Sequence, residues 1–455
     1  MNRRRFLSSS VAIPLAAQAP QRRRPNIVLI LADDLGYGDL GCYGQKVITT
    51  PRIDQLASEG LRFTQAYAGC TVCAPSRCAL MTGRHTGHCL VRGNFYPDLP
   101  LRKTDITLTE VLKQAGYRTG LFGKWSLGGL GTSGYPLDKG FDEFVGFFSQ
   151  THAHNYYPEH LLENRGSLLL RGNMGTQKKE YAPDIFTDRA VRFVEAAARN
   201  RQQPFFLHLS HPAPHANNEL GRDTGNGMEV PEDAPYSSRP WPKPEKNFAA
   251  MVTRLDRDVG RVLDRLKQLG LDEDTLVIFT SDNGPHREGG HDAAFFSSSG
   301  ALTGTKRDLT EGGIRVPFIA RWAGTIQPGV SDHVVAFWDL LPTFAELAGA
   351  PAPRDVDGIS IAGALRGAPA RSHEYLYWEF HEGRFQQAIR MGAWKAIRNR
   401  GRTALYDLAR DVGESDDVSA RHPDVLARIE PLFAQARTES MHWPVKPGEG
   451  PPERR

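Results

Sequence analysis

The stretch Pro25-Asn26-Ile27-Val28-Leu29-Ile30-Leu31-Ala32-Asp33-Asp34 decides the fold. A short, continuous run of apolar β-formers is typical of a strand buried on both faces of a parallel or mixed sheet. Ligand sites in open α/β sheets collect at the carboxyl ends of such strands. Adjacent carboxylates repel each other there, so a cation or hydrogen bonds must offset their charge. Asp33 and Asp34 could belong to a plain loop, but their place after a strand favours a metal site.

A later stretch repeats this arrangement. Residues 275–280 form a second apolar run, which ends in Ser281-Asp282-Asn283-Gly284. Parallel strands would bring Asp282 and Asn283 to the same sheet edge as the first aspartate pair. Carboxylate and amide groups offer hard oxygen ligands, which favour calcium over zinc or copper.

The remaining sequence alternates helical and strand patterns, which predicts an α/β fold: a central mixed, largely parallel sheet flanked by helices. We expect helices at 50–59, 107–114, 184–200, 248–269 and 338–347, and strands at 61–66, 117–122, 204–210 and 314–322. Beyond a Pro/Gly/Ala-rich linker (351–369), residues 385–397 and 403–407 alternate as antiparallel strands around a turn at Arg400-Gly401. With a closing helix at 423–437, they predict a small C-terminal α+β subdomain.

These patterns divide the 455 residues into a leader (1–24), a catalytic domain (25–370), the C-terminal subdomain (371–440) and a disordered tail (441–455). The leader has an arginine cluster before Phe6-Leu7, a weakly apolar segment and the triplet Ala17-Gln18-Ala19. This layout resembles a twin-arginine signal peptide, although a disordered basic arm is the alternative. We therefore expect a soluble, exported protein, periplasmic or secreted, that uses the export machinery and has no stable membrane insertion.

Charge and cysteine content narrow the possible partners. Six of the 56 basic residues are arginines of the leader; without them 50 basic residues face 52 acidic ones, a net charge of −2. The folded part therefore has no global basic field, and we expect no nucleic-acid partner. Cys42, Cys70, Cys78 and Cys89 could form one or two disulfides after export, but their pairing cannot be read from the sequence.

A fifth cysteine, Cys73, lies in the most distinctive motif, Cys73-Ala74-Pro75-Ser76-Arg77. Pro75 suits the first turn of a helix, which places Cys73 at the helix start, where the free N–H groups favour negative charge. A reactive group is one interpretation, and a buried structural cysteine is another. A zinc site made by Cys70, Cys73 and Cys78 is a third, but it lacks a second Cys-x-x-Cys.

The whole pattern, Cys-x-Pro-Ser-Arg followed by Met81-Thr82-Gly83-Arg84, resembles the signature of the type I, formylglycine-dependent sulfatases. This arylsulfatase family belongs to the alkaline-phosphatase-like superfamily, so the resemblance implies that sandwich fold with a smaller C-terminal domain. It further implies that a formylglycine-generating or sulfatase-maturating enzyme oxidises Cys73 to 3-oxoalanine (formylglycine). The hydrate of this aldehyde would be the nucleophile and Arg77 would hold it in place. One calcium ion would be bound by Asp33, Asp34, Asp282, Asn283 and position 73.

Two lysines match the sulfate-binding positions of the same family. Gly123-Lys124-Trp125-Ser126-Leu127-Gly128 resembles the family's Gly-Lys-Trp-His-Leu-Gly, and Lys306 precedes Glu311-Gly312-Gly313 by five residues, as in its second signature. Without the resemblance, both would be solvated lysines near turns. Ser126 departs from the family's histidine, which is thought to take a proton from the formylglycine hydrate when sulfate is expelled. The identity of that base is therefore open, and a water or another histidine could substitute.

Histidines supply the remaining candidates. His215 follows a predicted strand in the proline-rich turn 211–215 and resembles the family's general acid for the leaving alcohol, although a structural histidine is the alternative. His154, in the aromatic loop 151–158, is a candidate for substrate specificity and binding. His286 and His291 could line the rim of the same pocket.

The predicted function is hydrolysis of a sulfuric ester, on a sulfated carbohydrate or an aryl sulfate. Two alternatives stay open: a phosphonate monoester hydrolase or phosphodiesterase on the same fold, and a non-catalytic glycan-binding relative, for which Ser126 is the motivation.

Overall fold

The strand quoted above is the central strand of the molecule. In the computed structural model, which describes residues 24–445, β1 (Asn26–Asp33) is buried along its whole length. It pairs in parallel with β8 (Phe205–Pro214) on one side and with β9 (Thr275–Ser281) on the other. The predicted signal peptide lies outside the described residues, except for Arg24, as does the tail from residue 446.

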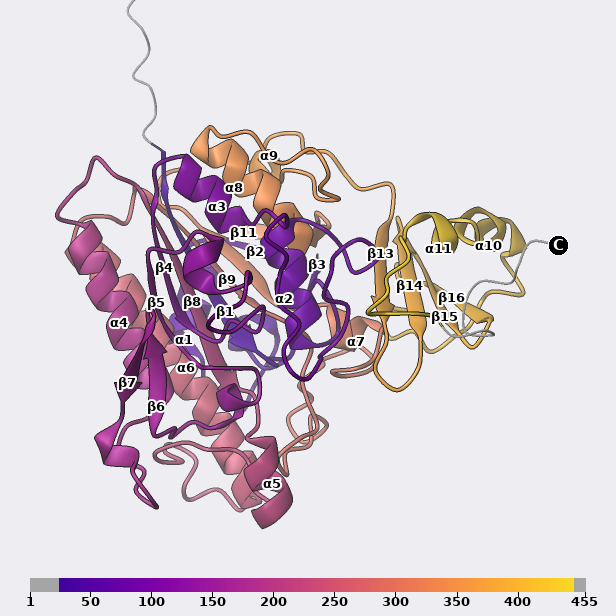
Figure 1. The fold of residues 1–455 in the computed structure, drawn as a ribbon. Helices are drawn as coiled ribbons and strands as arrows, with labels where there is room; N and C mark the ends of the chain where they lie inside the picture. The colour runs from indigo at the N-terminus through magenta and orange to yellow at the C-terminus, as the bar shows by residue number, and fades with distance from the viewer. Residues whose placement is uncertain (1–23, 446–455) are drawn as a thin grey trace, which may run out of the picture.

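These three strands belong to a ten-stranded sheet in the order β11-β2-β10-β9-β1-β8-β4-β5-β6-β7 (Figure 1). The central strands β9, β1, β8, β4 and β5 are parallel, and antiparallel pairs join β9 to β10, β10 to β2, β5 to β6 and β6 to β7. The other bounds are Leu61–Phe63 (β2), Arg118–Gly123 (β4), Glu143–Gly146 (β5), His160–Glu163 (β6), Gly166–Leu169 (β7), Phe318–Arg321 (β10) and Gly329–Ser331 (β11). The predicted mixed, largely parallel sheet is confirmed.

Helices cover both faces of this sheet, and the alternation of β1 explains how. Val28, Ile30 and Ala32 pack in one core with helices α1 (Pro51–Ser58), α4 (Ala182–Ala197) and α6 (Lys243–Gln268). Ile27, Leu29 and Leu31 face the opposite core, with α2 (Cys73–Thr82), α3 (Leu108–Gln114) and α8 (Leu340–Ala348). Successive strand residues point to opposite faces, so one strand anchors both layers.

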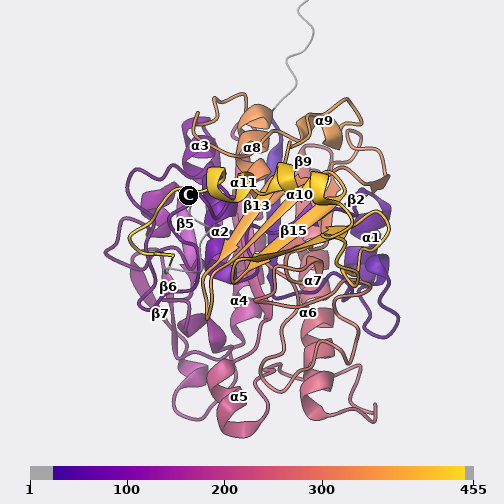
Figure 2. The same cartoon turned by 90° about the vertical axis from the view of Figure 1, so that its right-hand side faces the viewer.

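The predicted C-terminal subdomain is a separate four-stranded antiparallel sheet covered by two short helices (Figure 2). Its elements are β13 (Leu376–Phe380), β14 (Gln386–Met391), β15 (Trp394–Asn399), β16 (Arg402–Asp407), α10 (Pro423–Ile429) and α11 (Leu432–Gln435). Tyr377 and Ile389 pack with Leu405, Ile429 and Phe433 in a core of its own.

Several predicted elements differ in detail. The expected strand 314–322 is wrong at its start: Ile314 ends helix α7 (Glu311–Ile314), and β10 begins at Phe318. The expected turn at 211–215 is also wrong, because β8 continues through Pro214. The single helix expected at 423–437 is two helices, residues 385–397 form two strands, and β13 was not predicted.

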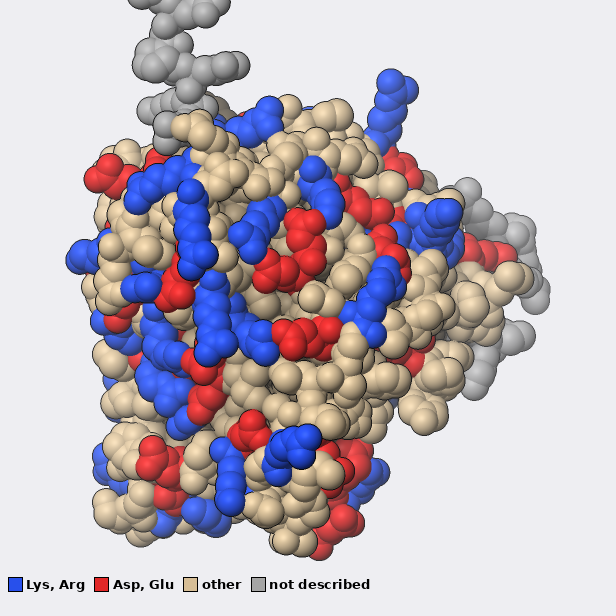
Figure 3. Space-filling model, turned by 60° about the vertical axis from the view of Figure 1, so that its left-hand side comes forward, with Lys and Arg blue, Asp and Glu red and all other residues tan. Residues whose placement is uncertain are grey.

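The smaller elements connect these layers. They are β3 (Ala66–Tyr67), β12 (Val335–Ala336), α5 (Asn218–Thr224), α9 (Ala362–Leu365) and the 3₁₀ turns η1 (Gly41–Tyr43), η2 (Pro136–Lys139), η3 (His152–His154), η4 (Arg171–Asn173) and η5 (Phe337–Asp339). Of the described helices, none has the length and apolar character needed to span a bilayer. Acidic and basic side chains are interspersed over the face drawn in Figure 3, in keeping with the nearly balanced composition.

Candidate active site

Cys73 is the first residue of α2 and is buried at the carboxyl edge of the sheet. Its Sγ lies 2.7 Å from Nε2 of Gln150 and 3.7 Å from Oδ1 of Asn94. Burial raises the pKa of the thiol, even though Lys124 opposes the shift. An unmodified cysteine in this place is therefore a protonated thiol, and the N-terminus of α2 has not made it a thiolate.

The predicted metal ligands converge on Cys73. Asp33 ends β1, Asp34 follows with φ of +64°, and Asp282 follows the neighbouring β9. The ligand atoms of Asp33, Cys73 and Asp282 all lie within 4.8 Å of one another, and so do those of Asp33, Asp34 and His215. A left-handed backbone is uncommon outside glycine, and here it places two consecutive carboxylates in one site.

Arg77 ties the ends of four strands together, and one turn of α2 separates it from Cys73. Its Nε donates to Asp282 Oδ2 (3.0 Å), and its Nη1 donates to Ser210 Oγ in β8 (2.5 Å) and to the carbonyl of Lys124 after β4 (2.9 Å). Its Nη2 forms an ion pair with Asp282 Oδ2 at 2.8 Å. It also lies 3.4 Å from Asp33 Oδ2. The side chain is buried, so this cation fixes the edge on which the carboxylates sit.

The two predicted lysines lie in the same site. Lys124 Nζ is 2.5 Å from Asp33 Oδ2, and Lys306 Nζ is 2.8 Å from Asp34 Oδ2. Burial lowers the pKa of a lysine, but Asp33 and Asp34 reverse this effect, so the pKa values of both lysines are raised. Both are therefore charged. The sharp turn before Lys124 needs glycine, because a Cβ on Gly123 (φ +118°) would lie 1.9 Å from the carbonyl oxygen of Ser210.

His215 lies beside Lys306. Its Nδ1 donates to the carbonyl of Ala216 (2.7 Å), so Nε2 is free to accept from Lys306 Nζ (3.2 Å), and it lies 3.5 Å from Asp34 Oδ2. Burial and the charge of Lys306 lower the pKa of His215 well below its usual value. The imidazole is therefore neutral in this arrangement.

Of the other predicted histidines, two are in the site. The ring of His154 stacks on His215 with a centroid distance of 4.9 Å, and its Nδ1 lies 2.8 Å from Glu219. His286 hydrogen-bonds the carbonyl of Pro214 (3.0 Å) beside Asp34. His291 does not line a rim: it is buried against Phe248 and pairs with Glu245 of α6.

Three residues of the site were not predicted. Glu288 Oε2 lies 2.9 Å from Lys306 Nζ, while Asn94 and Gln150 contact Cys73 and each other (Gln150 Nε2 to Asn94 Oδ1, 3.0 Å). Gln150 comes from the loop after β5 and Asn94 from the loop after α2. Neither segment has a periodic pattern, and their only signal in the sequence is their polar character.

The oxygen atoms of this site fit a hard divalent cation. Asp33 Oδ1 and Asn283 Oδ1 are buried and have no hydrogen-bond partner among the described residues. The side-chain Nδ2 of Asn283 donates to Asp34 Oδ1 (2.7 Å), so the side-chain Oδ1 of Asn283 points away from Asp34 Oδ1. Burial and repulsion by Asp33 raise the pKa of Asp282 to about 7. Clustered carboxylates with spare acceptor oxygens are what calcium binds, and a bound cation would relieve this repulsion.

Ser126, which replaces the family's usual histidine, is also buried. Its backbone has φ of +68°, and its hydroxyl has no hydrogen-bond partner among the described residues. No contact therefore gives this side chain a chemical role.

The zinc hypothesis gains no support. The described groups of metal-ligating side chains include neither Cys70 nor Cys78, and Cys70 Sγ contacts the carbonyl of Glu379 instead (3.8 Å). All five cysteines are free in the structure.

Comparison with known proteins agrees with this geometry. Residues 25–350 match the family model described as Sulfatase, and residues 304–436 match one described as N-sulphoglucosamine sulphohydrolase, C-terminal. Human arylsulfatase A is 34% identical, over 93% of this chain and 90% of its own length. An N-acetylgalactosamine-6-O-sulfatase of Bacteroides thetaiotaomicron is 28% identical, over 91% of this chain and 94% of its own length.

Solved structures give the same result. The structure described as Ps i-CgsB in complex with k-i-k-neocarrahexaose superposes with a TM-score of 0.79 at 30% identity, covering 91% of this chain and 92% of that one. Fold and site thus define a sulfuric ester hydrolase with the alkaline-phosphatase-like fold. The chain belongs to the sulfatase family.

Proposed function

We propose that this sulfatase removes sulfate from a sulfated carbohydrate or aryl sulfate, using formylglycine derived from Cys73 and one bound calcium ion. The observation that carries the proposal is the meeting of Cys73 with three carboxylates and two charged lysines, all buried at one sheet edge. These residues come from segments far apart in the sequence.

Charge neutralisation is the first task of such a site, because the negative sulfate ester repels nucleophiles. Lys124 and Lys306 are held in their charged forms by Asp33 and Asp34, so they can receive the sulfate oxygens without first taking up a proton. Calcium would be held by Asp33, Asp34, Asp282, Asn283 and position 73, and when bound it supplies positive charge that offsets these carboxylates and the ester.

Position 73 would carry the nucleophile. The aldehyde, once formed, supplies as its hydrate one hydroxyl that attacks sulfur and a second that lets sulfate depart, which neither cysteine nor serine offers. Gln150 and Asn94 lie within contact of this position and would orient that group. Arg77 would hold the edge in register from below, through Asp282 and Lys124.

His215 would protonate the leaving alcohol from Nε2, the atom that faces Lys306 and Asp34. It is neutral in the absence of substrate, so it must gain its proton when the negative ester arrives and draws Lys306 away from it. An anion close to an imidazole raises its pKa, which makes this uptake a consequence of binding.

A carbohydrate substrate is favoured by the rim of the site. His154 pairs with Glu219 beside His215. Phe95, which follows Asn94, and Phe148, two residues before Gln150, are 46% and 49% exposed. Aromatic faces and paired polar groups suit sugar rings and hydroxyls. The names of two similar proteins, an N-acetylgalactosamine-6-O-sulfatase and a complex with a neocarrahexaose, agree with this choice.

We further propose that the chain is exported by the twin-arginine route to the periplasm or beyond, and that a formylglycine-generating or sulfatase-maturating enzyme modifies it. The domain limits 25–370 and 371–440 are part of this proposal.

Turnover on defined esters tests the function. The matured full chain should release sulfate from at least one member of a panel of sulfated mono- and oligosaccharides and aryl sulfates, and Cys73→Ala should not. Faster hydrolysis of aryl phosphonate esters than of any sulfate would instead identify the phosphonate hydrolase alternative. Sugar binding without turnover by fully modified protein would identify the glycan-binding alternative that Ser126 raised.

A further inference from the structure

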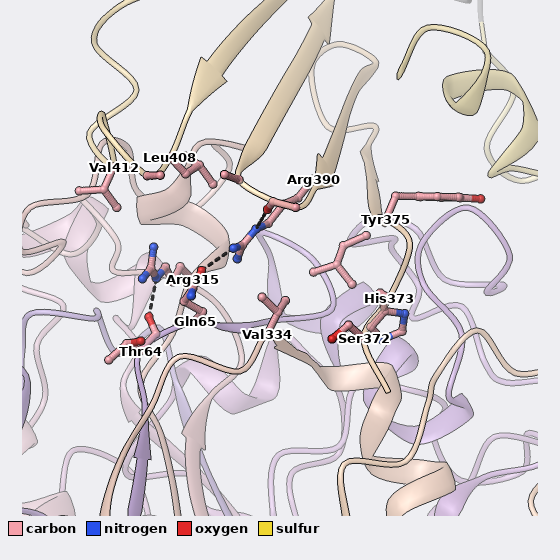
Figure 4. A pocket seen from close by; sticks show the side chains of 14 residues that line it. Thr64, Gln65, Arg315, Val334, Ser372, His373, Tyr375, Arg390, Leu408 and Val412 are labelled. Atoms are coloured by element: carbon pink, nitrogen blue, oxygen red, sulfur yellow. Dashed lines mark hydrogen bonds between the residues drawn. The ribbon is translucent and has the colours of Figure 1, made fainter. Parts of the chain in front are cut away.

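A cavity of about 510 Å³ lies at the junction of the two sheets, away from the site described above. It is lined by Thr64, Gln65, Arg315 and Val334 of the large domain and by residues of the C-terminal sheet and its flanking loops (Figure 4). Two arginines, Arg315 and Arg390, meet there on either side of Gln65. None of its lining residues is acidic.

The position of the cavity separates it from the sulfatase chemistry. The loop before β14 reaches the catalytic site, since Glu382 accepts a hydrogen bond from the backbone of Asn94 (2.9 Å). The opposite end of β14 leads to Gly392, which lines the cavity. A six-residue strand spans roughly 17–20 Å, so the cavity is not an extension of the pocket around Cys73.

The charges around the cavity do not balance. Behind it, Lys395 is fully buried between Glu311 and Glu414, at 2.9 Å from each. Arg315 also pairs with Glu311 (3.2 Å), whereas Arg390 has no carboxylate partner among the described residues. This buried group therefore contains three basic side chains but only two acidic ones, Glu311 and Glu414.

Arg390 is bonded only to neutral acceptors. It donates to the carbonyl of Gly392 (3.0 Å), to the hydroxyl of Tyr67 (2.5 Å) and to Gln65 Oε1, as the dashed lines of Figure 4 partly show. A guanidinium has five N–H groups, so two of them are uncommitted. Arg390 is 6% exposed, and Glu311 is linked to it through the hydroxyl of Tyr67, which donates to Glu311 Oε2 (2.7 Å). A buried cation that no carboxylate contacts directly is costly unless an anion completes it.

The remaining lining describes the body of the ligand. Val334, Leu376, Leu408 and Val412 form apolar walls, and His373 and Ser372 add polar groups at one end. The volume is in the range of small-molecule sites, and the mixture of a few polar groups with apolar walls is typical of them.

We propose that this cavity is a second binding site, separate from the catalytic one, for a sugar-sized anion whose carboxylate or sulfate group is bound by Arg390 and Arg315. Guanidinium groups bind both oxyanions through paired N–H donors, so the two charged groups share one chemistry. The walls accept the uncharged part of the ligand. The proposal needs no turnover and stands apart from the assignment of the catalytic residues.

Isothermal titration of the full-length Cys73→Ala protein tests this site, with sodium glucuronate and sodium sulfate as separate probes. At least one probe should show a binding site that Arg390→Gln weakens by about tenfold or more, because a hydrogen bond to a charged group is lost. Arg402→Gln, at an 85% exposed arginine of the same sheet, should leave it unchanged.

A second pair of variants covers the case in which Arg390→Gln fails to fold. Val412 is half-buried at the cavity, so Val412→Glu adds a carboxylate beside the arginines while Val412→Gln adds a neutral group of the same shape. Only the glutamate should abolish binding, and neither should alter sulfate ester turnover in the matured enzyme. Equal affinity in the two Val412 variants, or no site of this kind for either probe, would overturn the proposal.

Discussion

Two buried groups of charges, one at the catalytic edge and one at the junction of the two sheets, differ in what they leave unpaired. At the catalytic edge, acceptor oxygens of Asp33 and Asn283 remain without partners. At the junction, N–H donors of Arg390 remain without an anion. Both groups are built from lysine, arginine and carboxylates, so composition does not separate them. The two groups differ in their unpaired atoms: unpaired acceptor oxygens favour a cation, and unpaired guanidinium N–H donors favour an anion.

The largest expected effect is a loss of turnover from a substitution at the catalytic edge that leaves its charged residues unchanged. Cys73→Ala removes the precursor of the nucleophile, and turnover should fall by roughly 10³–10⁴-fold or more. The thiol has no charged partner to lose, so unfolding by denaturant should change little. The measurement is sulfate release beside a denaturant titration of the same preparations. Retained turnover would identify another nucleophile.

The next prediction concerns the carboxylate oxygens that would bind calcium. Asp282→Asn should lose the bound calcium, because a charged ligand becomes neutral beside Asp33 and Arg77. Metal content after dialysis measures this directly. Asp256→Asn is the matched control: Asp256 is equally buried, but it caps helix α1 through the N–H groups of Arg52 and Ile53. Undiminished calcium in Asp282→Asn would remove this residue from the ligand set.

The junction should behave in the opposite way, with stability lost and chemistry kept. Glu311→Gln leaves Lys395 and Arg315 short of a buried partner, which should lower the free energy of unfolding by about 3–5 kcal/mol. Calcium content and kcat should stay within a few-fold of the parent. Glu59→Gln, which breaks a pair between the exposed Glu59 and Arg321, should cost less than about 1 kcal/mol, because Arg321 keeps its pair with Asp272. Equal losses in the two variants would contradict the contrast.

The pH dependence sharpens the contrast further. Burial and the charge of Lys306 lower the pKa of His215. In the free enzyme, His215 therefore becomes protonated only when the pH falls below the usual pKa of a histidine. For an alkyl sulfate, whose leaving group needs a proton, kcat/KM should therefore fall as the pH rises through the acid range. An aryl sulfate with a good leaving group should show a shallower fall, and His215→Gln should remove the difference. Parallel profiles for both substrates would exclude His215 as the acid.

The smallest effect is expected at Ser126. Its hydroxyl has no partner, so Ser126→Ala should change kcat by no more than about twofold and stability by less than about 0.5 kcal/mol. A large loss of kcat would show that the hydroxyl participates in catalysis.

Much of this architecture could be predicted from the sequence. The runs before Asp33 and Asp282 are β-formers without interruption, and the structure places both aspartates at one sheet edge. Lys124 and Lys306 were found only because their surroundings resemble a known signature. Site residues could thus be predicted where they directly follow a buried strand or lie in a dense sequence motif.

The rest could not be predicted for identifiable reasons. Gln150 and Asn94 reach Cys73 from irregular loops, whose path depends on tertiary packing. Pro212 and Pro214 indicated a turn, yet β8 continues through them because a register shift beside Asp33 accommodates the prolines. The sequence around Ile314 is compatible both with the start of a strand and with the end of helix α7, because a short apolar run does not distinguish a strand from a helix.

The central claim is that position 73 of the active protein has lost its sulfur. Peptide mass analysis of protein purified in active form tests it most directly. The tryptic peptide that contains residue 73 should have the mass of the aldehyde or its hydrate, in a proportion that rises with specific activity across preparations. Full activity with an unmodified cysteine at this position would contradict the account.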